Sequence, residues 1–174
     1  LTLSAYNNAN QRTNVFNQTD LTKTFRAGGV EHTLLVGAEL GRQDSSSLRN
    51  TGFFGAATGL VVSAASPVGA ATSFRQNGGD ANNNVKADVF AVYLQDQVAL
   101  SRQWKAIAGL RFDRFRASFD DRRTLVAATD LARTDRAFSP RAGLVWMPTP
   151  SQSYYVSASY AFLPSAEQLS LATA

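Results

Sequence analysis

Hydrophobic and polar side chains alternate along four stretches of the chain. In residues 104–112, one set of alternate positions holds tryptophan, alanine, leucine and phenylalanine, while lysine, glycine and arginine lie in the other set. The same alternation recurs in residues 32–40, 141–146 and 153–162. A period of two over such lengths predicts long β-strands with one apolar face.

No comparable stretch places apolar residues three and four positions apart, as one face of a helix requires. Residues 165–171 have a composition that suits a short helix. We therefore expect an all-β protein.

The links between the predicted strands alternate between short and long. Short turns are expected at residues 26–31, 100–103 and 147–152, and long links at residues 44–84 and 120–135. Strands of roughly 12 residues or more exceed the about 5–6 residues usual in soluble sheets. Short turns at one end and long loops at the other are typical of bacterial outer-membrane barrels. The pattern therefore predicts antiparallel, up-and-down strands of a transmembrane β-barrel.

In such a barrel the apolar set of side chains faces lipid and the other set, which is polar, lines the lumen. Aromatic residues are expected on the outward face near the membrane interfaces, and the candidates are Trp104, Trp146, Tyr154 and Phe162.

Composition excludes several kinds of site. The 174 residues include no cysteine and one histidine, His32, so disulfides, thiolate metal sites and histidine-based clusters or dyads are ruled out. The sequence contains neither a nucleophile-elbow motif nor a phosphate-binding loop. We therefore expect no catalytic residues, no protein metal ligands and no enzyme activity.

The charged residues indicate no particular partner. The net charge is +4, but arginine and aspartate are interspersed, so the chain is not expected to bind nucleic acid. Asp120 and Asp121 are adjacent and point apart in an extended segment, and Arg122 and Arg123 follow directly. We expect a solvated charge cluster there rather than a carboxylate pair for catalysis or Ca²⁺.

Five segments resemble, in order, the barrel of TonB-dependent outer-membrane receptors. They are residues 31–40 (EHTLLVGAEL), 92–97 (VYLQDQ), 109–113 (GLRFD), 138–146 (FSPRAGLVW) and 155–165 (YVSASYAFLPS). The first of them is similar to a strand of the siderophore-receptor branch.

The resemblance implies uptake of a ferric siderophore across the bacterial outer membrane. In the family, a 22-stranded barrel is plugged by an N-terminal domain whose terminal box engages TonB, which acts with ExbB and ExbD. We count six or seven strands in residues 1–174 and see no plug, TonB box or terminal aromatic residue. The chain is therefore expected to be an internal piece of the barrel domain, to contact outer-membrane lipid, and to self-associate through open strand edges when isolated.

Two sets of residues are candidates for function. Arg111 and Asp113 lie two apart on one strand and are expected to face the lumen, as are Glu39 and Arg141. Such a polar wall either contacts the plug or forms a ladder of ion pairs that satisfies its own charges, and the polar interior of barrels favours the ladder.

The second set lies in the long link at residues 44–84 and consists of Arg49, Phe53, Phe54, Phe74 and Arg75. Ferric siderophores are often anionic and aromatic, so these side chains could bind one by charge and stacking. The alternative is a mobile surface loop whose aromatic residues fold back on the barrel mouth. The siderophore would itself supply the oxygens around the iron, so no cofactor bound by the protein is expected.

Two other classes of protein share the alternating pattern. One is a different outer-membrane barrel, such as a porin or adhesin, and the other is a soluble β-sandwich binding module. The ordered family segments favour the receptor over another outer-membrane barrel. A need for detergent would distinguish either barrel from a soluble β-sandwich.

Overall fold

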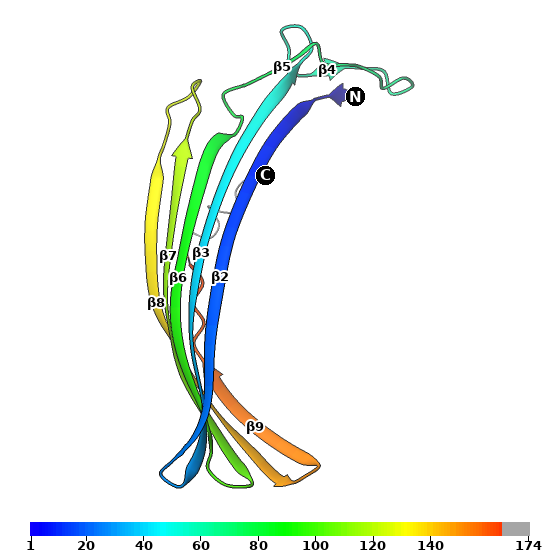
Figure 1. The fold of residues 1–174 in the computed structure, drawn as a ribbon. Coiled ribbons are helices and arrows are strands. Elements are labelled where there is room, and N and C mark those ends of the chain that lie inside the picture. The colour runs from blue at the N-terminus through cyan, green and yellow to red at the C-terminus, as the bar shows by residue number, and fades with distance from the viewer. Residues whose placement is uncertain (165–174) are drawn as a thin grey trace.

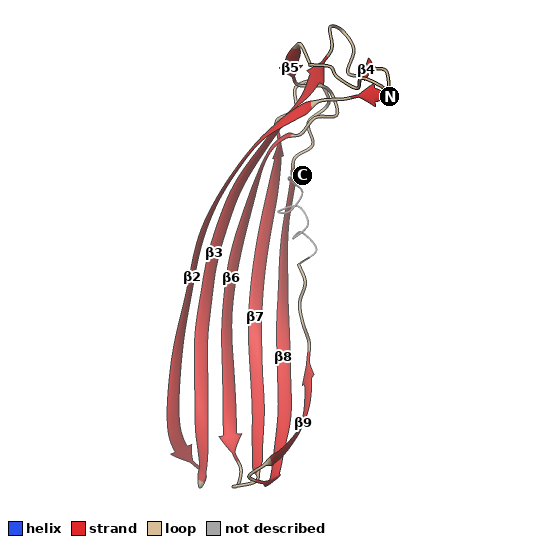
Figure 2. Cartoon of the chain, turned by 90° about the vertical axis from the view of Figure 1, so that its right-hand side faces the viewer, coloured by secondary structure: helices blue, strands red, loops and turns tan. Residues whose placement is uncertain are grey.

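The computed structural model describes residues 1–164, and every regular element in that range is a β-strand (Figure 2). The strands are β1 (Thr2–Leu3), β2 (Tyr6–Ala27), β3 (Val30–Phe53), β4 (Leu60–Val61), β5 (Ser73–Arg75), β6 (Asn82–Ala99), β7 (Trp104–Asp121), β8 (Leu131–Thr149) and β9 (Gln152–Ser159). Within the described range, no helix is long and apolar enough to cross a membrane. The all-β prediction is confirmed, and the short helix expected at 165–171 lies outside the described residues.

The six long strands form one antiparallel sheet in which each strand pairs with its neighbours in the chain. The order is β2-β3-β6-β7-β8-β9, and β5 adds a short pairing to the end of β3. β1 and β4 form a separate two-stranded sheet. The sheet is strongly bowed, and its edge strands β2 and β9 do not pair with each other (Figure 1). This arrangement is an open, up-and-down part of a barrel wall, as predicted.

Three tight turns lie together at one end of the sheet (Figure 1). Gly28 and Gly29 join β2 to β3 with φ of 58° and 81°, respectively. Positive φ at both central residues is what a two-residue hairpin requires, and glycine adopts it without steric cost. Residues 100–103 and 150–151 form the other two turns, so all three short connections lie where the sequence predicts them.

The strands extend further from these turns than the alternation of hydrophobic residues indicates. β3 continues to Phe53 and β7 to Asp121, so the links expected at 44–84 and 120–135 shrink to residues 54–81 and 122–130. The predicted loop boundaries are therefore wrong. The physical reason is that the outer ends of the strands carry polar side chains on the convex face, which removes the apolar signal but leaves the hydrogen-bonded ladder intact.

An apolar band covers the convex face next to the turns. On β7 it begins at Trp104, which stacks on Trp146 with ring centroids 5.8 Å apart, and ends at Phe112, which meets Phe138 at 5.0 Å. Tyr154 on β9 extends the tryptophan row, 5.6 Å from Trp146. Residues 104–112 match the about 9–11 residues with which a tilted β-strand crosses a bilayer.

On β6 and β7 the polarity of the two faces reverses beyond this band. Arg114 and Arg116 continue the convex face of β7, whereas Phe115 and Ala117, on the concave face, are buried with Ala87 in a small hydrophobic core. The expectation of a polar inward face holds for Glu39, Arg111 and Asp113 and for the outer part of β3, but it is wrong for the outer parts of β6 and β7. There water replaces lipid outside, and the sheet buries its concave side chains instead.

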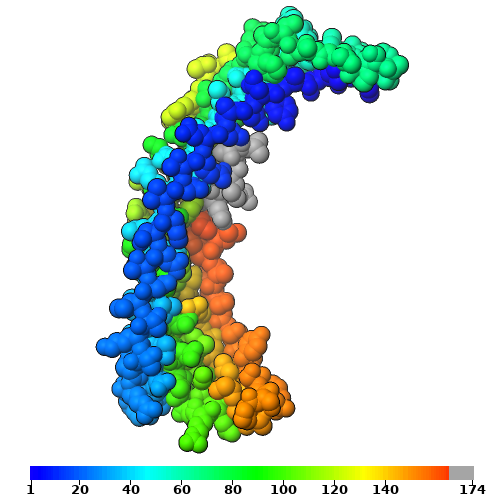
Figure 3. All heavy atoms as spheres, turned by 45° about the vertical axis from the view of Figure 1, so that its right-hand side comes forward, coloured from blue at the N-terminus to red at the C-terminus, as the bar shows by residue number. Residues whose placement is uncertain are grey.

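Residues 160–164, which follow β9, lie in the hollow of the bowed sheet (Figure 3). Phe162 follows the end of β9 and lines a pocket on the concave face with Glu39 and Arg111. The prediction that the last strand reaches residue 162 and places Phe162 on the outward face is therefore wrong.

Candidate functional site

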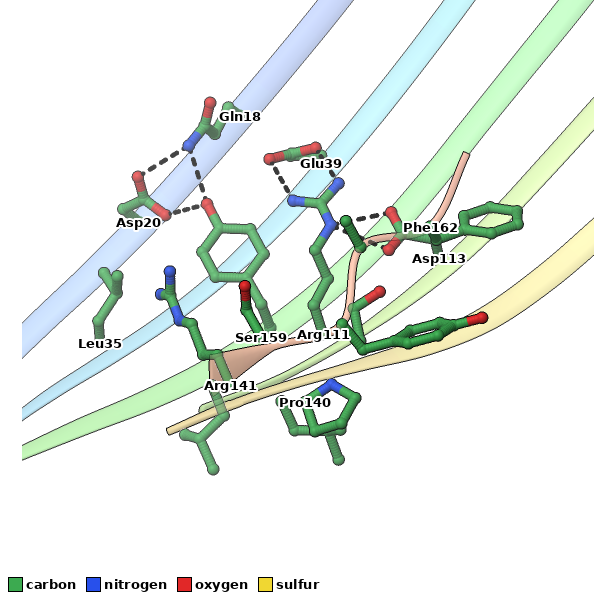
Figure 4. A pocket seen from close by; sticks show the side chains of 16 residues that line it. Gln18, Asp20, Leu35, Glu39, Arg111, Asp113, Pro140, Arg141, Ser159 and Phe162 are labelled. Carbon is green, nitrogen blue, oxygen red and sulfur yellow. Dashed lines mark hydrogen bonds and ion pairs between the residues drawn. The ribbon is translucent and has the colours of Figure 1, made fainter. Parts of the chain in front are cut away.

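Arg111 is the centre of an ion-pair network on the concave face (Figure 4). Its terminal nitrogens donate to both oxygens of Glu39, at 2.8 Å and 2.6 Å, and its Nε donates to the carboxylate of Asp113 at 2.8 Å and 3.1 Å. Such two-pronged arginine–carboxylate pairs are strong and geometrically specific. The structure thus brings together three of the four residues expected to face the lumen.

Small side chains make this network possible. Glu39 lies on β3 and Arg111 on β7, with β6 between them, and the residue of β6 in register with both Glu39 and Asp113 is Ala91. Ala91 is fully buried, and the Arg111 side chain reaches across its strand to Glu39. A larger side chain at position 91 would separate the two partners.

A second polar cluster lies beside the first and involves residues that the sequence did not single out. The Tyr93 hydroxyl donates to Asp20, and the Gln18 amide donates to Asp20 at 3.1 Å and to the Tyr93 hydroxyl at 2.9 Å. Gly37 lies between Asp20 and Tyr93 in the sheet register, and a Cβ there would overlap both side chains. A glycine inside a strand indicates such close approach, so Gly37 was the available signal.

Arg141 lies in the same region but differs from Arg111 in its contacts. It is paired in register with Gly109, over which its side chain lies, and it is exposed and makes no ion pair within residues 1–164. Both arginines line a pocket of about 540 Å³ on the concave face. Within the described part of the chain, the charge of Arg111 is therefore balanced by carboxylates and that of Arg141 is not.

The residues predicted to contact a ligand lie at the far end of the sheet from the turns, and most of them belong to strands. Arg49 and Phe53 are in β3, Phe74 and Arg75 are in β5, and Phe54 directly follows β3. The Arg75 guanidinium lies 4.0 Å from the centre of the Phe53 ring.

Arg49 forms the matching pair with Tyr6 of β2. Its guanidinium lies 4.4 Å from the centre of the Tyr6 ring, and its Nε lies 3.6 Å from the buried Asp80 carboxylate. Asp80 also accepts bonds from the backbone and hydroxyl of Thr51 at 2.9 Å and 2.8 Å.

Arg49 and Phe53 share the strand face of Glu39, so both cation–aromatic pairs belong to the lumen side. Phe74 pairs in register with Gly52 and lies on the other face.

Asp121 anchors the loop of residues 122–130. It accepts bonds from the Arg123 side chain at 2.9 Å and 2.6 Å and from the backbone N–H groups of Arg123 and Thr129, each at 3.1 Å. The Arg123 side chain, followed by these N–H groups, holds the pKa of the Asp121 carboxyl well below its usual range. The expectation of a solvated cluster is wrong for Asp121, which is 5% exposed. Successive side chains of a strand point to opposite faces, so Asp120 faces outward and Asp121 faces the buried concave side.

Replacing Asp121 with asparagine should therefore loosen this loop. Because the pKa of Asp121 is lower in the folded protein than in the unfolded chain, its carboxylate contributes fully to the free energy of unfolding at neutral pH. That contribution is lost as the pH falls below the unfolded-state pKa of about 3.9. Limited trypsin digestion at neutral pH should cut Asp121→Asn faster than the parent protein within residues 122–130. Asp120→Asn is the control, since its carboxylate bonds the exposed Arg122 side chain, and equal cleavage of the two variants would contradict the role given to Asp121.

No metal site is formed by the part of the chain that the structure describes, in which no three His, Cys, Asp or Glu residues gather. His32 instead stacks on Phe25, with ring centroids 5.2 Å apart, and its Nδ1 lies 2.6 Å from the Asp96 carboxylate. This pair lies on the convex face close to the turns.

Comparison with known proteins assigns the family. Residues 2–173 match the family model described as TonB dependent receptor-like, beta-barrel. The chain belongs to the TonB-dependent receptor family. Members of this family are receptors and transporters of the outer membrane, which places this receptor chain there and sets aside the porin, adhesin and soluble-sandwich alternatives.

Two curated relatives and one solved structure illustrate the similarity. The metal-pseudopaline receptor CntO of Pseudomonas aeruginosa is 30% identical over 159 residues, 84% of this chain and 21% of CntO. The catecholate siderophore receptor Fiu of Escherichia coli (strain CFT073) is 30% identical over 106 residues, 60% of this chain and 13% of Fiu. The siderophore receptor PiuA from Acinetobacter baumannii shares the fold, with a TM-score of 0.67 at 22% identity over 86% of this chain and 24% of PiuA.

The receptor chain therefore spans about a fifth of CntO, and a smaller share of Fiu. In outer-membrane barrels the short turns face the periplasm. The tryptophan row thus marks the periplasmic interface, the Phe112–Phe138 pair marks the outer one, and Arg49 and Arg75 lie on the extracellular side.

Proposed function

We propose that the receptor containing this chain imports a ferric siderophore, driven by TonB with ExbB and ExbD. The observation that carries the proposal is the similarity to relatives named as receptors for a catecholate siderophore and for metal-pseudopaline. The chain contributes part of the barrel wall, and its role is transport rather than catalysis.

The chemistry of the extracellular end supports an anionic, aromatic cargo. Arg75 over Phe53 and Arg49 over Tyr6 present two cationic groups beside aromatic rings on the lumen side. A catecholate complex carries negative charge and flat rings, which such pairs bind by hydrogen bonds and stacking. The chelator's oxygens surround the iron, so the protein recognises the complex from outside and supplies no metal ligand.

A second cargo class is a metal complex other than a ferric siderophore, since CntO is named for metal-pseudopaline. Cells that depend on this receptor can be offered a catecholate chelator loaded with radioactive iron, and separately pseudopaline loaded with radioactive divalent metals other than iron. TonB-dependent uptake of the iron complex supports the first proposal. Uptake of the other metals without uptake of iron would replace it with the second.

Arg49→Gln/Arg75→Gln should weaken uptake of the iron complex about tenfold in half-saturation concentration, because two cationic contacts to an anion are lost. The measurement is initial uptake rate against complex concentration, with receptor levels matched by immunoblot. Arg122→Gln removes an exposed arginine from another extracellular loop and serves as the control. Unchanged half-saturation in the double variant would show that these arginines do not contact the cargo.

A further inference from the structure

Cationic side chains gather on the convex face immediately beyond the apolar band. A groove of about 480 Å³ is lined there by Arg42, Arg114 and Arg116, with one carboxylate, Asp88, and by the apolar Leu40 and Phe90. We call it the cationic groove. It extends from the edge strand β2 to β7, and because further barrel strands would pair with the edges of the sheet, none of them covers this face.

The arginines of this groove lack sufficient carboxylate partners. Arg42 lies 3.5 Å from Asp44 and 3.9 Å from Asp88. Asp88 is also in register with Arg116, but Arg114 and Arg116 have no ion pair or hydrogen bond within residues 1–164. Arg114 is moreover in direct register with Arg136 of β8, on the same face. Like charges directly opposite each other in a sheet repel, so an anion bound between these two arginines would stabilise the pair.

An apolar groove of about 560 Å³ continues the cationic groove towards the membrane centre. It is lined by Val36, Val92, Leu94, Leu110, Phe112 and Phe138. On the convex face, Phe112 is the next side chain after Arg114 along β7 towards the turns, and Val92 is the next after Phe90 along β6. The two grooves therefore meet at the outer membrane interface. Their combined surface is apolar at membrane depth and cationic just above it.

We propose that the two grooves form one binding site for a phosphorylated lipid of the outer leaflet. Its phosphate lies against Arg114, Arg116 and Arg136, and an acyl chain lies along the apolar groove. Arginine suits this role because its planar fork binds phosphate oxygens in pairs. A second copy of the chain is a poorer occupant, since a symmetric contact would bring the same arginines together. This inference goes beyond the proposed transport function and is independent of the cargo.

The test uses the whole receptor in a mild detergent, titrated with lipid and followed by native mass spectrometry. Dipalmitoyl phosphatidic acid should bind in discrete numbers, more tightly than dipalmitoyl phosphatidylcholine and more tightly than short-chain dihexanoyl phosphatidic acid. Inorganic phosphate at the same concentration should not displace it. Arg114→Gln/Arg116→Gln should weaken binding about thirtyfold, because each arginine near a lipid surface contributes about fivefold.

Arg26→Gln/Arg102→Gln is the matched control, since it removes two exposed arginines near the periplasmic turns and should leave binding unchanged. Four outcomes would overturn the proposal: equal binding of both headgroups, equal loss in the control, no loss in the groove variant, or displacement by inorganic phosphate. The last would reduce the site to a free-anion site. Siderophore uptake by the same variants tests the transport proposal separately.

Discussion

Ala142→Arg should lower the free energy of unfolding of the membrane-inserted receptor by about 2–4 kcal/mol. Ala142 lies on the convex face of β8, between Trp146 and Phe138, and its neighbours in register are Ala108 and Ala158. A guanidinium at this depth would lie in hydrocarbon, and the nearest carboxylate in its register row, Asp96, lies two strands away and is already paired with His32. The measurement is a guanidinium chloride titration of the receptor in lipid vesicles, followed by tryptophan fluorescence.

Ala132→Arg is the matched control, because it makes the same substitution on the same strand and the same face. Ala132 lies beyond the apolar band, next to Ser118, so its free energy of unfolding should change by about 0–1 kcal/mol. If the two variants lose equal stability, the apolar band between Trp146 and Phe138 is not the membrane-spanning part of the strand.

Arg111→Met should destabilise the receptor by about 2 kcal/mol, since it leaves two carboxylates without their shared cation. Glu39 and Asp113 each have side chains only 15% exposed, so water compensates them incompletely. The same titration measures the effect. Arg141→Met, which removes a lumen arginine without an ion pair in the described chain, should be nearly neutral.

The triple variant Glu39→Gln/Arg111→Met/Asp113→Asn separates charge from packing. Because the unpaired charges are gone, it should recover most of the stability lost in Arg111→Met. If instead it is less stable than Arg111→Met, the loss comes from the contacts of the arginine stem, and the ion-pair ladder is not what holds this part of the wall. Uptake that fails in a stable triple variant would favour the plug-contact interpretation.

Much of the fold could be predicted because a lipid-facing strand has a simple pattern. The outward tryptophan at position 104 and phenylalanine at 112 lie on one face by parity alone, and the Gly28-Gly29 turn identifies the first hairpin. The outer strand ends could not be predicted in this way. Residues such as Ser45 and Ser47 are buried on the concave face although they are polar, and their ladder partners on β2 and β6 become visible only once the strands are aligned.

The candidate site could be predicted in part for the same reason. Spacing by two places Arg111 and Asp113 on one face, but nothing local connects either of them to Glu39, which is 72 residues away from Arg111. That contact depends on the lateral register of three strands and on the small size of Ala91. The cluster of Asp20 and Tyr93 depends on register too, and Gly37 marks it only after the strands have been paired.

The reversal of polarity on β6 and β7 near the Phe112–Phe138 pair makes the alignment of these two strands especially well determined. A shift of one residue between neighbouring strands would exchange their faces. In the membrane half a shift of β7 would move charged lumen residues such as Arg111 into lipid, and in the outer half it would bring Arg114 into the interior beside the buried Ala91 of β6. A one-residue shift in register is therefore unfavourable in both the membrane half and the outer half of the sheet, so a misaligned hairpin is not stable at either depth.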